Sequence, residues 1–200
     1  MTHPTRIDRP ELTLPDAEAA LVRSCYQDAD VILEYGSGGS TAMGAEMPGK
    51  RIFSVESDKD WALMMRGWFA ANPPAERTEV DVIWSDIGPT KQWGHPASHA
   101  AWERYARYPL EVWDLPEFRQ PDVVLVDGRF RTGCALATGF RSLKTLTLLM
   151  DDYARRKNYH RVETYLGTPE LTGRMARFEV KPMPVPADRL LEIIRMMTQP

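Results

Sequence analysis

The sequence predicts an α/β protein with a doubly wound, mainly parallel sheet and an antiparallel C-terminal part. Three observations indicate this fold. Five short apolar runs alternate with segments of helical periodicity. Each run is nearly uninterrupted, as expected of strands that are buried on both faces. A glycine-rich turn follows the first run. Because crossovers between parallel strands are right-handed, few topologies remain, and the doubly wound open sheet is the commonest of them.

The first elements follow from local signals. Pro15 suits a first helical position, and Asp16 and Glu18 favour a first turn, so we predict a helix that runs to about Gln27. Strands and helices then alternate along the chain, as the apolar runs and helix caps indicate. We predict strands at 31–33, 51–56, 80–84, 123–126 and 146–150, and helices from the glycine turn to about 46, at 59–71 and at 132–142.

Two regions break this alternation. Residues 87–121 contain Pro, Gly and six large aromatic residues, and we expect a partly helical cap or insertion over the site. After Gly167 the chain reads as antiparallel, with a strand at 175–180 and a Pro-rich turn. The last segment, 190–197, is compatible with a helix or a strand, and its pattern favours a helix slightly.

Length and composition restrict the class of protein. The 200 residues (22.8 kDa) predict one domain over 1–200. A net charge of −3 argues against a nucleic-acid binder. The polar lead (residues 1–14) has no apolar signal core, and no stretch reaches the roughly 20 apolar residues that span a bilayer. Cys25 and Cys134 are read as reduced thiols, so we expect a cytoplasmic protein. The oligomeric state is left open.

Acidic residues follow all five predicted strands. In open α/β sheets, ligands bind beyond the carboxyl ends of the strands, where these side chains would gather. Asp is also a common turn former and helix cap, so each position alone has a purely structural explanation. A full set at five strand ends favours a ligand site. The acids are Glu34, Glu56, Asp86, Asp127 and the pair Asp151–Asp152.

The glycine turn discriminates between nucleotide ligands. A dinucleotide fold requires G-x-G-x-x-G, and here Gly36 and Gly38 fit, but Thr41 stands at the third position. Glu34 would repel a pyrophosphate, whereas it suits a ligand that carries an ammonium and a sulfonium group. Glu56 is suitably placed to accept hydrogen bonds from ribose hydroxyls. These residues favour S-adenosylmethionine over NAD.

Residues 34–41 (Glu-Tyr-Gly-Ser-Gly-Gly-Ser-Thr) look like the first motif of class I S-adenosylmethionine-dependent methyltransferases, which have a Rossmann-like fold. The resemblance covers roughly residues 15–166. Residues 126–131 and 150–153 look most like bacterial methyltransferase-like proteins akin to small-molecule O-methyltransferases. One position departs, because Ser40 replaces the usual third glycine. The resemblance implies that the cofactor contacts Glu34, Gly36, Ser37, Gly38, Gly39, Ser40, Thr41, Glu56 (ribose), Asp86 (adenine) and Asp127.

The resemblance also suggests a metal. In metal-dependent O-methyltransferases, of which catechol O-methyltransferase is the familiar type, acids after the fourth and fifth strands hold Mg²⁺. Asp127 and Asp151 or Asp152 resemble those positions, and carboxylates are suitable ligands for Mg²⁺. The alternative is that Asp127 anchors a turn and that the pair caps the following segment.

Acceptor binding is predicted near a basic segment, residues 129–161, which has eight Arg and Lys residues and two acids. Arg129 and Arg131 directly follow a strand-end acid, and Arg suits bidentate binding of carboxylate or phosphate groups. Asp127, Arg129 and His160 are the candidate catalytic residues, with His160 a candidate general base. Trp93 is a candidate for stacking on a planar substrate. A solvated basic face, a surface histidine and packing aromatics are the alternatives.

These observations together predict an S-adenosylmethionine-dependent methyltransferase that acts on a small, anionic or hydroxylated molecule. One alternative is a methyltransferase-like interaction domain that does not transfer methyl groups, and Ser40 and the lack of a compelling general base are compatible with it. Another is an NAD-dependent oxidoreductase, against which Glu34 argues. The methyl acceptor cannot be read from the chain, because a fold does not determine a substrate.

Overall fold

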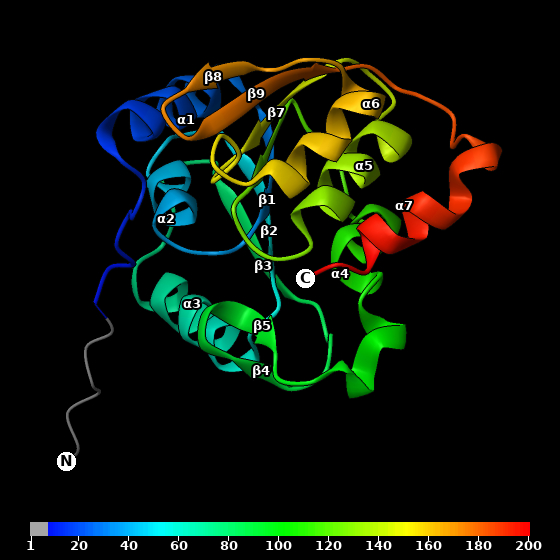
Figure 1. Ribbon diagram of the computed structural model, residues 1–200. Coiled ribbons are helices and arrows are strands. Elements are labelled where there is room, and N and C mark those ends of the chain that lie inside the picture. The colour runs from blue at the N-terminus through cyan, green and yellow to red at the C-terminus, as the bar shows by residue number, and fades with distance from the viewer. Residues whose placement is uncertain (1–7) are drawn as a thin grey trace.

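The computed structural model describes residues 8–200, so the first half of the polar lead lies outside the described residues. One sheet has the strand order β3-β2-β1-β6-β7-β9-β8 (Figure 1). Its first five strands are parallel, and β9 runs antiparallel to both β7 and β8. The strands are β1 (Val31–Tyr35), β2 (Arg51–Glu56), β3 (Glu79–Trp84), β6 (Val123–Val126), β7 (Leu146–Met150), β8 (Glu170–Thr172) and β9 (Met175–Val180). The predicted fold class is confirmed, although β8 was not anticipated.

Helices cover both faces of this sheet (Figure 1). Successive strand residues point to opposite faces, so Ile32 packs in a cluster with Tyr26 and Met43 while Leu33 packs in another with Leu136. Between residues 8 and 200 no helix has the length and apolar character needed to cross a membrane. The helices are α1 (Asp16–Asp28), α2 (Gly39–Ala45) and α3 (Lys59–Ala71) on one face, and α4 (Arg107–Leu110), α5 (Arg131–Arg141), α6 (Glu163–Leu166) and α7 (Leu190–Met197) on the other.

The strand register places the predicted site residues at one edge. Tyr35 pairs with Val55 of β2 and with Val126 of β6. Because these strands are parallel and aligned, the residues that follow them leave the sheet at the same edge. Gly36 and Asp127 therefore emerge as neighbours.

The segment between β3 and β6, which we call the cap (residues 87–121), is partly helical, as predicted. A short hairpin of β4 (Thr90–Lys91) and β5 (His95–Pro96) precedes 3-10 turns at 99–104 and 111–114 that flank α4. Tyr105, Tyr108 and Trp113 are buried against the sheet. These aromatic residues form part of the core, so they are not available to stack on a substrate.

The C-terminal segment is a helix, which resolves the ambiguity of the sequence. Helix α7 packs on α5, where the Thr132 hydroxyl donates a 3.0 Å hydrogen bond to the Met196 carbonyl. Ile193, Met196 and Met197 are buried, whereas Leu191 and Ile194 face outward. The apolar residues therefore recur at helical spacing, and the short length of the segment concealed this period.

Candidate functional site

The turn after β1 is tight and depends on glycine. Gly36 has a φ of +104°, and a Cβ there would lie 2.7 Å from the backbone nitrogen of Gly128. The Gly36 amide donates to the Val55 carbonyl at 2.8 Å, which binds the turn to β2. Gly38 is open, with no atom within 4 Å of a Cβ built on it. The turn thus brings three strand ends together and leaves Gly38 available for close approach of a ligand.

The residues after Gly38 support this turn from the inside. Gly39 packs against the backbone of Glu11. The Thr41 hydroxyl accepts a 2.9 Å hydrogen bond from the Gly38 amide, and Ser40 and Thr41 are buried. The Ser37 hydroxyl lies 2.7 Å from that of Ser54. In this conformation, the side chains of Ser37 and Thr41 hold the turn in place.

Glu34 does not lie where the sequence analysis expected it. Its side chain is fully buried on the face covered by α1, where its Oε1 accepts a 2.6 Å hydrogen bond from the Tyr26 hydroxyl. Burial raises the pKa of Glu34 above its usual value. Oε2 has no hydrogen-bond partner among the described residues. The expected direct contact with a ligand ammonium group does not fit this position, because β1 directs even-numbered side chains away from the cap.

Glu56, at the end of β2, has its carboxylate at the predicted edge. Its Oε1 accepts hydrogen bonds from the amides of Ser57 (2.7 Å) and Asp58 (2.8 Å), and its Oε2 accepts one from the Ser37 amide (3.2 Å). Burial raises the pKa of Glu56, and these hydrogen bonds oppose the rise. Oε2 carries a single protein contact and can accept a further hydrogen bond, as a ribose hydroxyl would require.

Asp86 lies beyond β3, and the cap engages it. Its Oδ1 accepts from the Gly88 amide (2.9 Å), and its Oδ2 accepts from Nη1 of Arg104 (2.8 Å), a residue of the cap. Its side chain is 33% exposed. Two cap residues, Gly88 and Arg104, thus contact the acid that the resemblance assigns to adenine.

The cap contacts the other strand ends as well. The Ser57 hydroxyl donates to the Gly94 carbonyl at 3.0 Å, and the Tyr108 hydroxyl donates to the Val55 carbonyl at 3.3 Å. The cap therefore lies against the ends of β2 and β3 in this conformation. Trp93 has a φ of +64°, and its side chain is 74% exposed at the tip of the hairpin.

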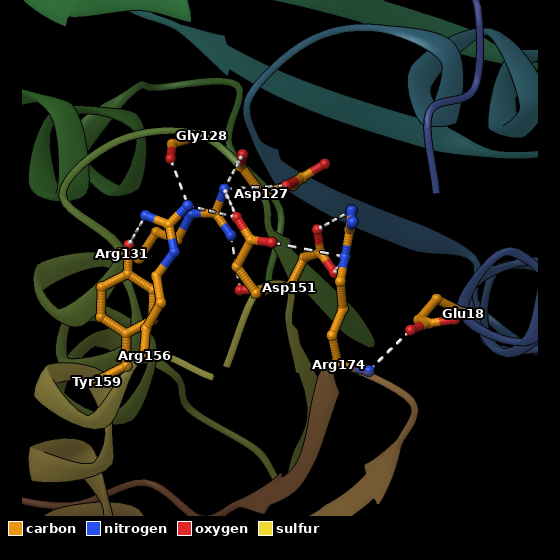
Figure 2. Close-up of polar contacts among 9 residues, drawn as sticks. Glu18, Asp127, Gly128, Arg131, Asp151, Arg156, Tyr159 and Arg174 are labelled. Carbon is orange, nitrogen blue, oxygen red and sulfur yellow. Dashed lines mark hydrogen bonds and ion pairs between the residues drawn. The ribbon is translucent and has the colours of Figure 1, made fainter. Parts of the chain in front are cut away.

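Asp127, at the end of β6, lies in an ionic cluster with Asp151 at the end of β7 (Figure 2), and Asp152 joins it through Arg131. Nη2 of Arg131 is 3.1 Å from Asp127 Oδ1. Burial raises the pKa of Asp127 from 3.8 to about 7; the Arg131 guanidinium opposes this rise, and the neighbouring Asp151 carboxyl adds to it. Asp127 is therefore a group that can take up and release a proton near neutral pH.

Two arginines follow Asp127, and they differ in availability. Arg131 is 5% exposed, and its donors are used by Asp127, by Asp152 and by three backbone carbonyls. Each of its three nitrogens has a partner, so Arg131 is a structural partner of the acids. Arg129 is half-buried, its Nε has no partner among residues 8–200, and burial lowers its pKa. Of the two, Arg129 is the one available to an anion.

His160 is not placed for the predicted role of general base. Its ring stacks on Tyr153 with centroids 4.6 Å apart, and its Nε2 lies 3.2 Å from the Tyr153 carbonyl oxygen. A histidine that is used in this way is poorly placed to act as a general base. The geometry favours Asp127 over His160 for proton transfer.

The three acids do not fit a divalent cation. Asp151 is 1% exposed and receives two hydrogen bonds from Arg174, at 2.9 and 2.8 Å (Figure 2). Asp152 accepts one from Arg156 at 2.9 Å. Over residues 8–200, no group of three or more His, Cys, Asp or Glu residues could hold a metal ion. The expected Mg²⁺ site at Asp127, Asp151 and Asp152 is therefore not supported, because guanidinium groups contact the carboxylates.

Sequence reasoning missed several partners in this region. Arg174, Arg104 and Tyr26 each contact a predicted acid from another element or loop, at separations of 23, 18 and 8 residues. No local motif marks them, since Arg174 is 23 residues from Asp151 and lies in an unremarkable turn. Two arginines of the basic segment 129–161, Arg131 and Arg156, form ion pairs with the acids, which the expectation of an anion site does not include.

Known proteins place the chain in a family. No protein-family model matches it, and neither does any curated protein. Among solved structures, a methyltransferase-like protein from Silicibacter pomeroyi DSS-3 is 59% identical, with a TM-score of 0.94 over 96% of this chain and 99% of that one. Nearly the whole of both chains is therefore shared.

More distant structures share the fold alone. The O-methyltransferase TomG from Streptomyces achromogenes, solved with SAM, is 16% identical over 86% of this chain and 82% of that one (TM-score 0.54). An O-methyltransferase from Bacillus cereus, solved with SAH, is 13% identical over 86% and 84% (TM-score 0.52). With its strand order, its glycine turn and this 59% identity, the chain belongs to the methyltransferase-like family and has the class I S-adenosylmethionine-dependent methyltransferase fold.

Proposed function

We propose that the protein is an S-adenosylmethionine-dependent methyltransferase that acts on a small anionic or hydroxylated molecule in the cytoplasm. The observation that carries this proposal is the arrangement at one sheet edge. The open Gly38, the carboxylate of Glu56 and the carboxylate of Asp127 follow three adjacent strands. The structures of distant O-methyltransferases with SAM or SAH on the same fold support it.

Each residue at the sheet edge has its own part in cofactor binding. Gly38 allows close approach of the cofactor, Glu56 accepts from ribose hydroxyls, and Asp86 accepts from the adenine amino group once Arg104 releases it. Bound there, S-adenosylmethionine supplies an electrophilic methyl group on its sulfonium. Binding both reactants in line removes much of the entropic barrier to such a displacement.

Asp127 and Arg129 serve the acceptor in this proposal. Asp127 takes the proton from the acceptor hydroxyl, because its pKa of about 7 suits proton transfer at neutral pH. Arg129 receives an anionic group of the acceptor, since its buried Nε otherwise lacks a partner. Trp93, exposed at the hairpin tip, is free to cover a planar acceptor if the cap moves.

Calorimetric titration with S-adenosylmethionine and S-adenosylhomocysteine tests the cofactor site. We expect micromolar binding, and Glu56→Gln should weaken it about 10–100-fold, because a hydrogen bond to a charged group contributes about 1.5–3 kcal/mol. Glu79→Gln is the matched control, since that acid is exposed at the opposite end of the neighbouring strand β3. NAD should not bind. Equal affinity in both variants would argue against the site.

A second function has one observation in its favour. The cap contacts Ser57, Val55 and Asp86, so the edge is covered in this conformation. A methyltransferase-like interaction domain without methyl-transfer activity would retain this closed form permanently. The same titration separates the two, because a folded protein that binds neither S-adenosylmethionine nor S-adenosylhomocysteine supports the interaction domain.

A further inference from the structure

The ionic cluster at the ends of β6 and β7 is built to neutralise its own acids. It contains the carboxyl groups of Asp127, Asp151 and Asp152 and the three guanidinium groups that contact them (Figure 2). The guanidinium groups belong to Arg131, Arg156 and Arg174. Because the positive charges match the negative ones, and exceed them when Asp127 holds a proton, the cluster has little attraction for an added cation.

Arg131 is the central member of this cluster. Its Nη2 lies 3.1 Å from Asp127 Oδ1 and 3.3 Å from Asp152 Oδ2, so a single nitrogen bridges the acids of two adjacent strands. Its other donors bind the carbonyl oxygens of Gly128 (3.0 Å) and Asp151 (2.6 Å). Arg131 thus holds together acids of the two strand ends that the resemblance assigns to a metal.

Arg174 closes the cluster from the opposite side. It lies in the turn between β8 and β9, and it forms a two-point ion pair with Asp151. Its own position is set by Glu18 of α1, which accepts a 2.7 Å hydrogen bond from the Arg174 amide (Figure 2). The preceding residue, Gly173, has a φ of +57°, and a Cβ there would lie 2.2 Å from Oε1 of Glu18, so glycine suits this position. Helix α1, the turn between β8 and β9 and the end of β7 therefore all contribute to the position of the Arg174 guanidinium.

From this geometry we propose that Arg131 and Arg174 replace a divalent cation as the positioning groups for the acids of the acceptor site. The proposal rests on the proposed function only for the role of Asp127 toward the acceptor. It also restricts the substrate class. An acceptor here is not selected by chelation of a metal, so vicinal hydroxyls are not required, and a single ionisable hydroxyl or carboxyl group beside Asp127 suffices.

The test is whether removal of a guanidinium creates a cation site. Arg174→Met removes the partner of Asp151 on the accessible side of the cluster, where the Arg174 side chain is 35% exposed. Melting is measured in EDTA and in millimolar Mg²⁺, Ca²⁺ or Mn²⁺, and Mn²⁺ binding is measured by electron paramagnetic resonance. For wild type we expect no shift. For Arg174→Met we expect cation-dependent stabilisation of several degrees and at least tenfold tighter Mn²⁺ binding, because three carboxylates then outnumber the guanidinium groups.

Two further variants keep the outcome decisive. Arg51→Met is the matched control. It removes a guanidinium from two acids of β3, Asp81 and Glu79, and should gain no cation response. If Arg174→Met fails to fold, Arg156→Met removes the more exposed partner of Asp152 and should gain a weaker response. Cation-dependent melting of wild type, or a folded Arg174→Met without any gain, overturns the proposal. Neither measurement uses cofactor, so failure of the proposed function is detected separately.

Discussion

At the scale of single residues, backbone geometry around Gly36 makes the site possible. A side chain at this position would have to adopt a left-handed conformation and would approach Gly128 closely. Gly38, two residues later, has extended φ and open surroundings. The two glycines therefore do different work, the first in folding and the second in ligand access.

Alanine substitutions should separate these two roles. We expect Gly36→Ala to lower the free energy of unfolding by about 2–4 kcal/mol, through strain and overpacking. Gly38→Ala should change it by less than about 1 kcal/mol while weakening cofactor binding, because the methyl group faces open space. Urea denaturation measures the first effect and calorimetric titration the second. Equal stabilities of the two variants would contradict this assignment.

At the scale of elements, the cap determines access to the predicted cofactor residues. Its hairpin contacts Ser57, its helix α4 contacts Val55, and Arg104 pairs with Asp86. The contact to Asp86 is half-exposed, so it contributes little to stability. Such a contact is suited to break when a ligand enters.

Removal of the Arg104–Asp86 ion pair should make it easier for S-adenosylmethionine to enter the site. We expect Arg104→Ala to raise the association rate of S-adenosylmethionine about two- to fivefold, because an exposed pair contributes less than about 1 kcal/mol. Arg107→Ala makes the same charge change at an exposed position of the cap and is the control. Stopped-flow fluorescence measures the rate. An unchanged rate in Arg104→Ala would mean that the cap does not limit entry through this contact.

At the scale of the whole molecule, buried acids couple folding to pH. Asp127 has a pKa raised from 3.8 to about 7, so the folded state holds a proton that the unfolded state releases. The stability that this provides is fully present below pH 3.8 and is lost as the pH rises through about 7. Asp114 shows the opposite behaviour, because the Arg141 guanidinium lowers its pKa.

This coupling predicts a signature in the pH dependence of unfolding. Relative to Asp127→Asn, wild type should lose about 1–2 kcal/mol of stability between pH 4 and pH 7, since each pKa unit corresponds to about 1.4 kcal/mol and solvent reaches part of the carboxyl group. Relative to Asp114→Asn, wild type should instead gain stability as the pH rises toward 3.8 from below, since the folded pKa of Asp114 lies under that unfolded value. Chemical denaturation that extends from acidic pH through neutral pH measures both. A difference of the same sign for both variants would refute the account of Asp127.

The sequence by itself determined the parallel sheet, the glycine turn and the row of acids at the strand ends. Those features depend on short-range periodicity and on residues next to each strand, and the chain displays both directly. The positions of Glu56 and Asp127 at one edge followed from the parallel strands. The final helix was only weakly favoured, because a segment of eight residues contains barely two turns.

Only the tertiary structure decided how the acids are used. Glu34 proved to lie behind the turn with Tyr26, and the acids expected to hold Mg²⁺ proved to be paired with arginines, among them Arg174. Arg174 is 23 residues from Asp151 and reaches it because β9 runs antiparallel to β7. Arg131 and Arg156 lie only four residues after Asp127 and Asp152, but Arg131 also bridges to Asp152 on the neighbouring strand end. Contacts between different strand ends depend on distances in space, which local spacing does not encode, and so the chemistry of the cluster appears only once the chain is folded.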